Sequence, residues 1–288
     1  MAFSVSGPHV VGIAGLGPLG EEVRDYFEQS GAPAGAVHAR QGTGAAALIN
    51  DADVVFICAP PVYRPRIGLD DSELEATVSA LDGSKVIVIM AALQPGMTEA
   101  YQSRYPQHCF LVNPPFSRQA HLRDDFLRPD QQIVGYTAQS RHLAESIVSL
   151  LPVAGYTQIV PAREAEMTKL MTSTFLALKV IFANEVFDVC SALDIDYEVV
   201  REAVAADTRI GASHLDVLGG GYRGYGGAGL PRDVKSLLDL GGRLGVPLRV
   251  LSTADQVNAS FLPPGEPPSL QPVPIMPDED NEADERAA

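Results

Sequence analysis

Residues 164–193 read EAEMTKLMTSTFLALKVIFANEVFDVCSAL, the longest apolar-rich stretch of the chain without a glycine or a proline. The pattern predicts a single helix, which at 1.5 Å per residue would be about 45 Å long. Between Phe175 and Cys190 apolar side chains fall on every side of the helix, which is typical of a helix buried all round. Lys169 lies near its N-terminal end, with Thr172 and Ser173 on the same face. The pattern alone leaves open whether Lys169 is a surface residue or a functional one.

A glycine-rich turn near the N-terminus predicts a dinucleotide site. An apolar strand over residues 10–14 runs into GLGPLG at residues 15–20, and a helix pattern follows. Strand, glycine turn and helix in this order are the context that the GxGxxG fingerprint requires. Gly15 allows the tight turn, Gly17 lets the backbone approach a pyrophosphate, and Gly20 lets the helix pack closely against the strand. The amide groups at the start of the helix then face the phosphates.

The second strand, expected at residues 36–39, bears on which ribose is bound. An acidic residue that binds the ribose 2′-hydroxyl of NAD usually lies near the end of this strand, and here the chain has none. Arg40 and Thr43 stand there instead, and both suit the 2′-phosphate of NADP. We therefore favour NADP over NAD as the cofactor, although an Arg40 in a solvated loop would give the same pattern.

Strands and helices alternate through the first half of the chain. Near-continuous apolar runs predict buried parallel strands, and helix patterns separate them. The expected strands are residues 53–58, 85–90, 109–112 and 132–135, and the expected helices are residues 72–81, 98–104 and 141–151. Ala59, Pro60 and Ala92 lie in loops at the carboxyl ends of two strands, where open α/β sheets bind their ligands. We predict a doubly wound parallel sheet of the Rossmann type over residues 1–158.

Beyond residue 158 the expected elements are helices. The long helix is followed by helices over residues 196–205, 233–244 and 250–261. A glycine-dense segment at residues 219–229 contains Tyr225 and leads into Pro231-Arg232-Asp233, which is typical of a shaped binding loop, although a flexible linker has a similar composition. We predict an all-helical domain over residues 159–262, built on the long central helix, and a disordered proline-rich acidic tail over residues 263–288.

Composition argues against several classes of partner. The chain of 288 residues has a net charge of −15, which disfavours nucleic acid and anionic membrane surfaces. It shows no basic, apolar leader and no apolar run long enough to span a bilayer. Cys58, Cys109 and Cys190 lie in apolar contexts and are expected to be reduced, as in a cytoplasmic protein. The histidines lack the spacing of metal ligands, so we predict no metal.

The motifs of the second half resemble one enzyme family. They are Glu164-Ala165-Glu166-x-x-Lys169, Asn184-Glu185, Asp207-x-Arg209-Ile210-Gly211 and Gly224-Tyr225-Gly226-Gly227-x-x-x-Pro231-x-Asp233. Together with the glycine turn, Gln94-Pro95-Gly96 and Asn113-Pro114, this set resembles the central region of the UDP-glucose/GDP-mannose dehydrogenases. The resemblance covers about residues 9–250. It implies an oxidoreductase in which Lys169 and Asp233 remain from the family's catalytic set.

Several positions depart from that catalytic set. The family oxidises an alcohol twice through a catalytic cysteine, and the matching residue here is Gly229. Ala92 matches its catalytic-loop threonine, Ser173 its asparagine, and Pro115 and Gln119 its glutamates. We also expect a truncated member that lacks the family's third domain. The resemblance therefore supports neither the second, cysteine-dependent oxidation nor the binding of a nucleotide sugar.

The groups that remain also resemble, more distantly, the β-hydroxyacid dehydrogenases and imine reductases, which make one hydride transfer. The β-hydroxyacid dehydrogenases carry a lysine on the corresponding long helix. We expect Lys169 to act as general acid or base on an alcohol, ketone or imine, with a pKa lowered by burial. Asp233 would orient Lys169 or hold it charged, and Ser173 would bond the substrate.

The leading hypothesis is an NAD(P)-dependent oxidoreductase that makes a single hydride transfer to or from a small alcohol, ketone or imine, with Lys169 as general acid or base. Two alternatives stay open: a catalytically silent dinucleotide-binding scaffold or sensor, and a non-redox cyclase or lyase on the same fold. The candidate cofactor-binding residues are Gly15, Gly17, Pro18, Leu19, Gly20, Arg40, Thr43, Ala59, Pro60 and Ala92. The candidate substrate-binding residues are Asn113, Thr172, Arg209, Tyr225, Gly226 and Gly229.

The long helix also predicts an assembly. The roughly seventy residues that follow it are too few to cover such a helix all round, given how little core a small domain makes. Leucine, valine and phenylalanine side chains would then form a large exposed apolar patch. We therefore predict a homodimer in which residues 164–193 of two copies pack together.

Overall fold

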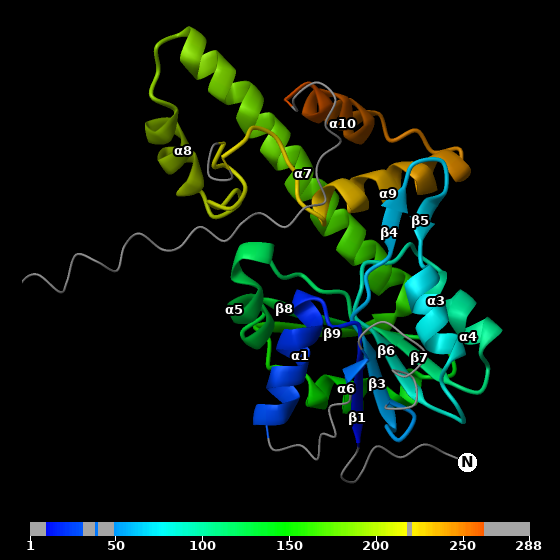
Figure 1. Ribbon diagram of the computed structural model, residues 1–288. Coiled ribbons are helices and arrows are strands. Elements are labelled where there is room, and N and C mark those ends of the chain that lie inside the picture. Colours follow the sequence, from blue (N-terminus) through cyan, green and yellow to red (C-terminus); the bar gives the residue numbers. More distant parts are fainter. Residues whose placement is uncertain (1–9, 31–37, 40–48, 218–220, 262–288) are drawn as a thin grey trace, which may run out of the picture.

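The computed structural model describes residues 10–30, 38–39, 49–217 and 221–261, which form a sheet with flanking helices and, above it, a group of helices (Figure 1). The strands are β1 (Val11–Ala14), β2 (His38–Ala39), β3 (Val54–Ile57), β4 (Val62–Arg64), β5 (Gly68–Asp70), β6 (Val86–Ile89), β7 (Cys109–Val112), β8 (Gln131–Tyr136) and β9 (Tyr156–Pro161). The helices are α1 (Pro18–Gln29), α3 (Ser72–Ser79), α4 (Met97–Arg104), α5 (Leu122–Leu127), α6 (Ala144–Leu150), α7 (Ala162–Ala192), α8 (Tyr197–Ala205), α9 (Leu230–Arg243) and α10 (Arg249–Phe261). Short 3-10 helices lie at Gln119–His121 and Arg141–Leu143.

The main sheet has the strand order β2-β1-β3-β6-β7-β8-β9, which confirms the Rossmann-type fold predicted from the sequence. Strands β1, β3, β6 and β7 are parallel and fully buried, as their continuous Val and Ile runs predict. The sheet is mixed rather than wholly parallel, because β8 pairs antiparallel with β7 and β9 pairs parallel with β8. The carboxyl ends of β1, β3, β6 and β7 therefore share one edge, where the predicted ligand loops begin.

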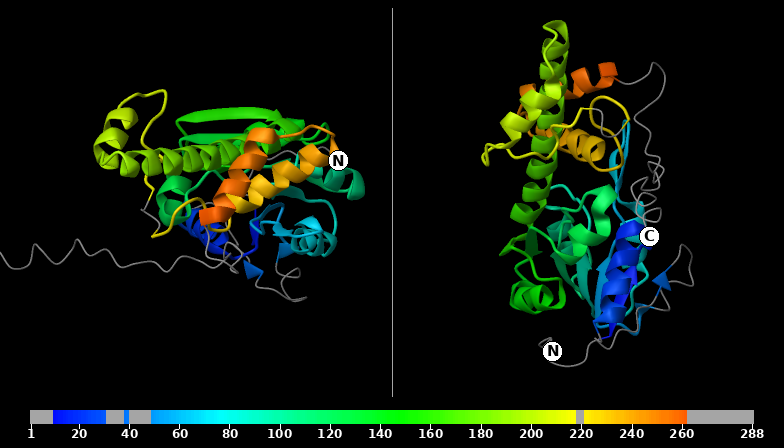
Figure 2. Two further views of the ribbon diagram at one scale, coloured as in Figure 1. Left: turned by 90° about the horizontal axis from the view of Figure 1, so that it is seen from above. Right: turned by 90° about the vertical axis from the view of Figure 1, so that its left-hand side faces the viewer.

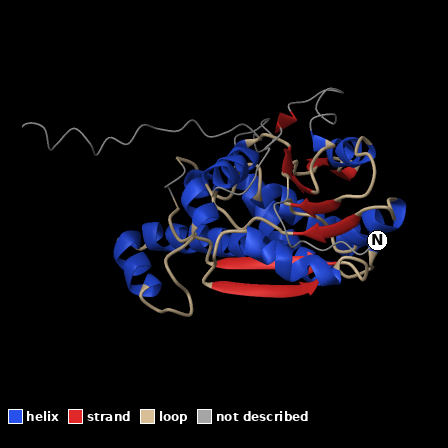
Figure 3. Cartoon of the chain, turned by 90° about the horizontal axis from the view of Figure 1, so that it is seen from below, coloured by secondary structure: helices blue, strands red, loops and turns tan. Residues whose placement is uncertain are grey.

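Two apolar clusters cover the two faces of the sheet, and Figure 3 shows helices on both sides of the strands. On one face α1, α5 and α6 bury side chains that include Val23, Phe27, Phe126 and Ile147. On the other face α3, α4 and the first turn of α7 bury side chains that include Leu74, Val78, Tyr101, Ala162 and Ala165. This three-layer arrangement is the doubly wound architecture that alternating strands and helices predict.

Four elements were not predicted from the sequence. They are α5, the antiparallel hairpin of β4 and β5, and the outer strand β9. The hairpin contacts α9, and β9 lies at the edge of the sheet with mostly exposed or half-buried residues. Half-exposed segments of this kind lack the apolar run that marks a central strand.

Helix α7 leaves the sheet and continues far beyond it, with α8 near its far end and α9 and α10 along its side (Figures 1 and 2). Its bounds agree with the predicted helix to within two residues. Ala177, Val180 and Ile181 pack against Tyr225, Val234 and Leu251, and a second cluster joins Ala183 and Cys190 to Tyr197 and Leu215. The expectation of burial all round is wrong for the single chain, because Phe175 and Phe182 are 64% and 66% exposed.

Among the described residues no helix combines the length and apolar character that crossing a membrane requires. Cys58, Cys109 and Cys190 are all buried and free, as the sequence predicts. The predicted tail over residues 263–288 lies outside the described residues.

Candidate active site where the long helix meets the sheet

The glycine turn between β1 and α1 has the close backbone contacts expected of a dinucleotide site. Gly15 has a φ of +83°, and a Cβ there would lie 2.8 Å from the Ala59 amide nitrogen. A Cβ on Gly20 would lie 2.0 Å from the Gly15 carbonyl oxygen, so only glycine fits between helix and strand. A Cβ on Gly17 would meet nothing within 4 Å. Helix α1 begins after Gly17, with Pro18 and Leu19 in its first turn and no side-chain cap. This open helix N-terminus fits a pyrophosphate.

The other predicted cofactor residues lie at the same edge of the sheet. Ala59 and Ala92 are buried just beyond β3 and β6, and Pro60 is exposed. A backbone hydrogen bond holds the end of β3 beside the glycine turn, because the Cys58 amide donates to the Ala14 carbonyl at 2.7 Å. Arg40 and Thr43, on which the preference for NADP rested, lie outside the described residues.

Lys169 lies on α7 close to the point where this helix leaves the sheet. Its side chain is 13% exposed, and Nζ lies 3.8 Å from Asp233 Oδ2 on α9. The ammonium also lies 5.7 Å from the centre of the Phe116 ring, which belongs to the loop after β7. Burial lowers the pKa of Lys169, the Asp233 carboxylate opposes that shift, and Arg232 adds to it. Lys169 is thus a buried functional candidate rather than a surface lysine.

Asp233 is a buried carboxylate with one free oxygen. Its side chain is 1% exposed, and Oδ1 accepts a hydrogen bond from Arg232 Nε at 2.8 Å. Within the described part of the chain, Oδ2 is buried and has no hydrogen-bond partner. Because a buried oxygen without a partner is costly, this atom is available to a water or a ligand hydroxyl beside Lys169.

Gly229 lies one helical turn before Asp233, whose amide donates to the Gly229 carbonyl at 3.0 Å. It precedes the first residue of α9 and makes no side-chain cap, and a Cβ there would meet nothing within 4 Å. Position 229 therefore has room for a side chain close to the Lys169–Asp233 pair, but the residue there is a glycine, which has no side chain.

Other predicted residues divide into near and distant ones. Ser173 is buried one turn after Lys169, whereas Thr172 Oγ1 donates within the helix to the Thr168 carbonyl at 2.8 Å. The Asn113 amide follows β7 but donates to Gln132 Oε1 and the Ile133 carbonyl, so it fixes the loop to β8.

Arg209 and Tyr225 lie apart from Lys169. The Arg209 guanidinium is largely exposed after α8 and pairs with Asp207 at 2.6 Å. Tyr225 is buried, its amide donates to Asn258 Oδ1, and its hydroxyl donates to Asp255 Oδ1, both on α10. Tyr225 is therefore a packing residue of the helical part. Gly226 lies against Tyr222, whose hydroxyl would be 2.8 Å from a Cβ at position 226.

The contact of Phe116 with Lys169 was not predicted. The loop 113–116 follows a strand at the ligand edge, which was the available signal, but its apolar sequence gave no reason to single out one side chain. Among the described residues no group of three or more His, Cys, Asp or Glu is arranged to hold a metal ion.

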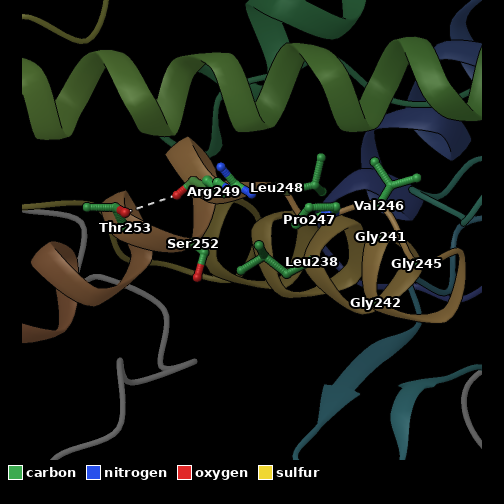
Figure 4. A pocket seen from close by; sticks show the side chains of 10 residues that line it. All are labelled: Leu238, Gly241, Gly242, Gly245, Val246, Pro247, Leu248, Arg249, Ser252 and Thr253. Atoms are coloured by element: carbon green, nitrogen blue, oxygen red, sulfur yellow. Dashed lines mark hydrogen bonds between the residues drawn. The ribbon is translucent and has the colours of Figure 1, made fainter.

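A hollow of about 850 Å³ lies elsewhere, between the end of α9 and the start of α10 (Figure 4). Its walls include Leu238, Val246, Leu248 and Arg249, and it contains neither Lys169 nor Asp233. The hollow is therefore separate from the candidate active site.

Comparison with known proteins identifies the second half of the chain. Residues 163–260 match the model of the UDP-glucose/GDP-mannose dehydrogenase family, central domain. The UDP-glucose 6-dehydrogenase AglM of Haloferax volcanii is 31% identical over 231 residues, covering 73% of this chain and 53% of the relative. The UDP-glucose 6-dehydrogenase of Pseudomonas aeruginosa is 33% identical over 149 residues, covering 51% of this chain and 32% of the relative. The chain thus spans about half or less of these relatives' length.

A solved structure shows the same fold. The UDP-glucose dehydrogenase of Pyrobaculum islandicum superimposes with a TM-score of 0.75 at 23% identity, covering 90% of this chain and 70% of that one. The prediction of NADP is wrong, because the UDP-glucose dehydrogenase family uses NAD⁺. A missing acidic residue after the second strand was therefore no evidence for a 2′-phosphate. The family match and the relatives together show that this chain carries, in residues 163–260, the central domain of the UDP-glucose/GDP-mannose dehydrogenase family.

Proposed function

We propose that this chain is an NAD⁺-dependent oxidoreductase of the UDP-sugar dehydrogenase kind, limited to a single hydride transfer between an alcohol and its carbonyl. The observation that carries the proposal is the buried Lys169–Asp233 pair, 3.8 Å apart, beside a position 229 that has no side chain. The glycine turn fits the pyrophosphate of the dinucleotide, as its backbone approach and open helix N-terminus require.

Lys169 suits the role of general base in alcohol oxidation. NAD⁺, when bound, supplies the acceptor for the hydride. The Lys169 amine accepts the hydroxyl proton, and the free Asp233 Oδ2 then stabilises the ammonium that forms. Because burial lowers the pKa of Lys169, a larger fraction of the neutral amine is present at a given pH.

Gly229 ends the reaction at the carbonyl. A second oxidation through a thiohemiacetal needs a thiolate beside the carbonyl carbon, and Gly229 offers none. Cys58 is packed against Gly20 of the glycine turn, and burial raises the pKa of its thiol to about 12. A thiol with that pKa is almost wholly protonated near neutral pH and is a poor nucleophile. The carbonyl product is therefore released.

The test is the stoichiometry of NADH with UDP-glucose and with a panel of smaller alcohols. We expect one NADH per substrate oxidised and a carbonyl product trapped by hydroxylamine. Lys169→Ala should lower kcat by at least about 100-fold, as removal of a general base does. Lys235→Ala is the control, because this half-buried lysine lies on the same helix as Asp233 but pairs with Asp255 on α10. Two NADH per substrate in the wild type would refute the single transfer.

Gly229→Cys sharpens the same test. The new side chain has room, so the variant should fold and should release a second NADH for each substrate molecule. NAD⁺ binding without turnover across the panel would instead favour a silent binding protein. Product formed without a change in NADH would favour a cyclase or lyase.

The assembly remains a proposal as well. Met171, Phe175, Phe182 and Val189 form an exposed apolar stripe along α7, at spacings close to whole turns. A stripe of this kind can pack against the same stripe of a second copy related by a two-fold axis. We propose that two copies of the chain pair through it.

A further inference from the structure

Glu166 is a charged residue buried in the apolar junction between α7 and the sheet. It lies on α7, three residues before Lys169, and its side chain is 0% exposed. Its carboxylate accepts hydrogen bonds from the Gly96 amide at 2.6 Å, the Thr98 amide at 2.9 Å and the Thr98 hydroxyl at 2.6 Å. Burial raises the pKa of Glu166 and these donors oppose the rise. A fully buried carboxylate with three donors fixes the elements it joins, because losing any donor is costly.

The donors belong to the N-terminus of α4. Gly96 is the residue before this helix, has a φ of +97°, and provides no side-chain cap. Glu166 therefore caps α4 from another helix, with its negative charge at the positive end of the helix dipole. The loop between β6 and α4, residues 91–96, carries Ala92 at the cofactor edge of the sheet. One carboxylate thus links this loop to the turn of α7 that precedes Lys169.

The same loop is held from its other side by α9. Gln94 donates to the Ser236 carbonyl at 2.9 Å and accepts from Arg243 at 2.5 Å. Helix α9 carries Asp233, so the loop at residues 91–96 is bonded both to the helix of Lys169 and to the helix of Asp233. A shift of the loop would move the two members of the pair relative to each other.

We propose that Glu166 is a positioning residue, which sets the distance between Lys169, Asp233 and the cofactor-facing loop at residues 91–96. The inference rests on the proposed function only for its effect on turnover, since the placement of Lys169 is a property of the chain without cofactor. A carboxylate that served stability alone would change unfolding but leave Lys169 where it is.

The first experiment compares Glu166→Gln with Glu164→Gln. The amide has nearly the shape of the carboxylate, but its NH2 group must face either the Gly96 amide or the Thr98 donors, and this donor–donor contact pushes the loop and α7 apart. Glu164 is exposed two residues earlier on the same helix and is the matched control. We expect Glu166→Gln to lower kcat roughly 10- to 100-fold, since misplacement by about 1 Å has effects of this size. KM for NAD⁺ should change less than kcat, and Glu164→Gln should match the wild type.

The second experiment needs neither cofactor nor turnover. The lysines of the chain are Lys85, Lys169, Lys179 and Lys235, and reductive methylation with ¹³C-formaldehyde makes each one visible by NMR. Lys169 is surrounded by Asp233, Arg232 and the Phe116 ring. We expect Glu166→Gln to admit water and to raise the pKa of Lys169 toward its ordinary value, while the NMR signals of the other three lysines stay as in the wild type.

Thr98→Val gives a milder version of the same change, because it removes one of the three donors and adds no clash. It should shift the pKa of Lys169 in the same direction by a smaller amount. If Glu166→Gln fails to fold, Thr98→Val tests the positioning role of Glu166 in its place. A wild-type pKa of Lys169 in both variants, with only the melting temperature lowered, would overturn the proposal. Absence of turnover in the wild type would remove the proposed function while leaving the NMR comparison intact.

Discussion

The two ends of α7 have opposite surroundings. At the near end Ala162, Ala165, Glu166 and Leu170 are all buried, and the helix packs on the sheet. At the far end Phe182, Val189 and Leu193 are largely exposed although they are more apolar. The difference is one of available partners, because the near end has the sheet, α4 and α9 around it, whereas the far end has α8 along one side (Figure 1).

Small residues explain how the near end fits so closely. A Cβ on Gly135 of β8 would lie 2.6 Å from Val112, 2.7 Å from Ala165 and 2.9 Å from Ala162, so sheet and helix are nearly in backbone contact. Close packing of this kind transmits small displacements, since protein interiors are as dense as crystals. The near end is therefore suited to holding Lys169 at a fixed distance from Asp233. The far end, with its large exposed apolar side chains, is suited to packing against a second protein surface.

Leu170→Ala should produce the largest loss of stability. Leu170 is 0% exposed next to the catalytic candidate, and deleting its side chain leaves a cavity in the packed interior. We expect a loss of about 2–5 kcal/mol in the free energy of unfolding, measured by urea denaturation. Val199→Ala on the exposed side of α8 should stay within about 0.5 kcal/mol. Equal losses in the two variants would mean that the burial of Leu170 at the near end of α7 adds no stability.

Phe182→Glu should separate the proposed dimer. A charge at the centre of an apolar stripe remains unpaired when two copies meet, and loss of a central hot-spot residue costs about 2 kcal/mol or more in interfaces. We expect the wild type to be a dimer at micromolar concentration by light scattering and the variant to be a monomer. Phe182→Leu keeps an apolar side chain and should stay dimeric. A monomeric wild type would refute the assembly.

Much of the fold follows from local patterns in the sequence. The buried strands β1, β3, β6 and β7 are continuous apolar runs, and α7 is a long stretch without helix breakers, so both were predicted to within a few residues. The antiparallel direction of β8 was not, because a strand's sequence does not record which neighbour it pairs with. The exposed face of α7 was not predicted for a related reason. The sequence of an apolar helix is the same whether the surface that buries it belongs to the same chain or to a partner.

The candidate site was predicted in part. Lys169 and Asp233 were predicted as catalytic residues from sequence motifs. They are 64 positions apart in the sequence and on different helices, and the structure brings them together. Arg209 and Tyr225 belong to the same motifs yet lie in an exposed turn and in a core, because a motif marks that a residue matters and not whether it touches substrate. The positioning role proposed for Glu166 could not be predicted from the sequence, since its three hydrogen-bond donors come from a different segment of the chain.

Asp233→Asn should show which charge controls the base at the near end. The carboxylate raises the pKa of Lys169 against the effect of burial, and Arg232 lowers it. Without the carboxylate both remaining influences lower the pKa, so the neutral amine persists to a lower pH. In alcohol oxidation the rate rises with pH as Lys169 loses its proton, and this rising limb should move to lower pH in the variant.

The plateau rate of Asp233→Asn should also fall, by roughly tenfold, because the ammonium formed in the reaction loses its counter-charge. Asp188→Asn is the matched control at the far end, where Asp188 pairs with Arg223 at 2.7 Å. Its pH profile of kcat should coincide with that of the wild type. A rising limb that stays in place or moves to higher pH in Asp233→Asn would show that Lys169 is not the titrating base, and the functional distinction between the two ends of α7 would then fail.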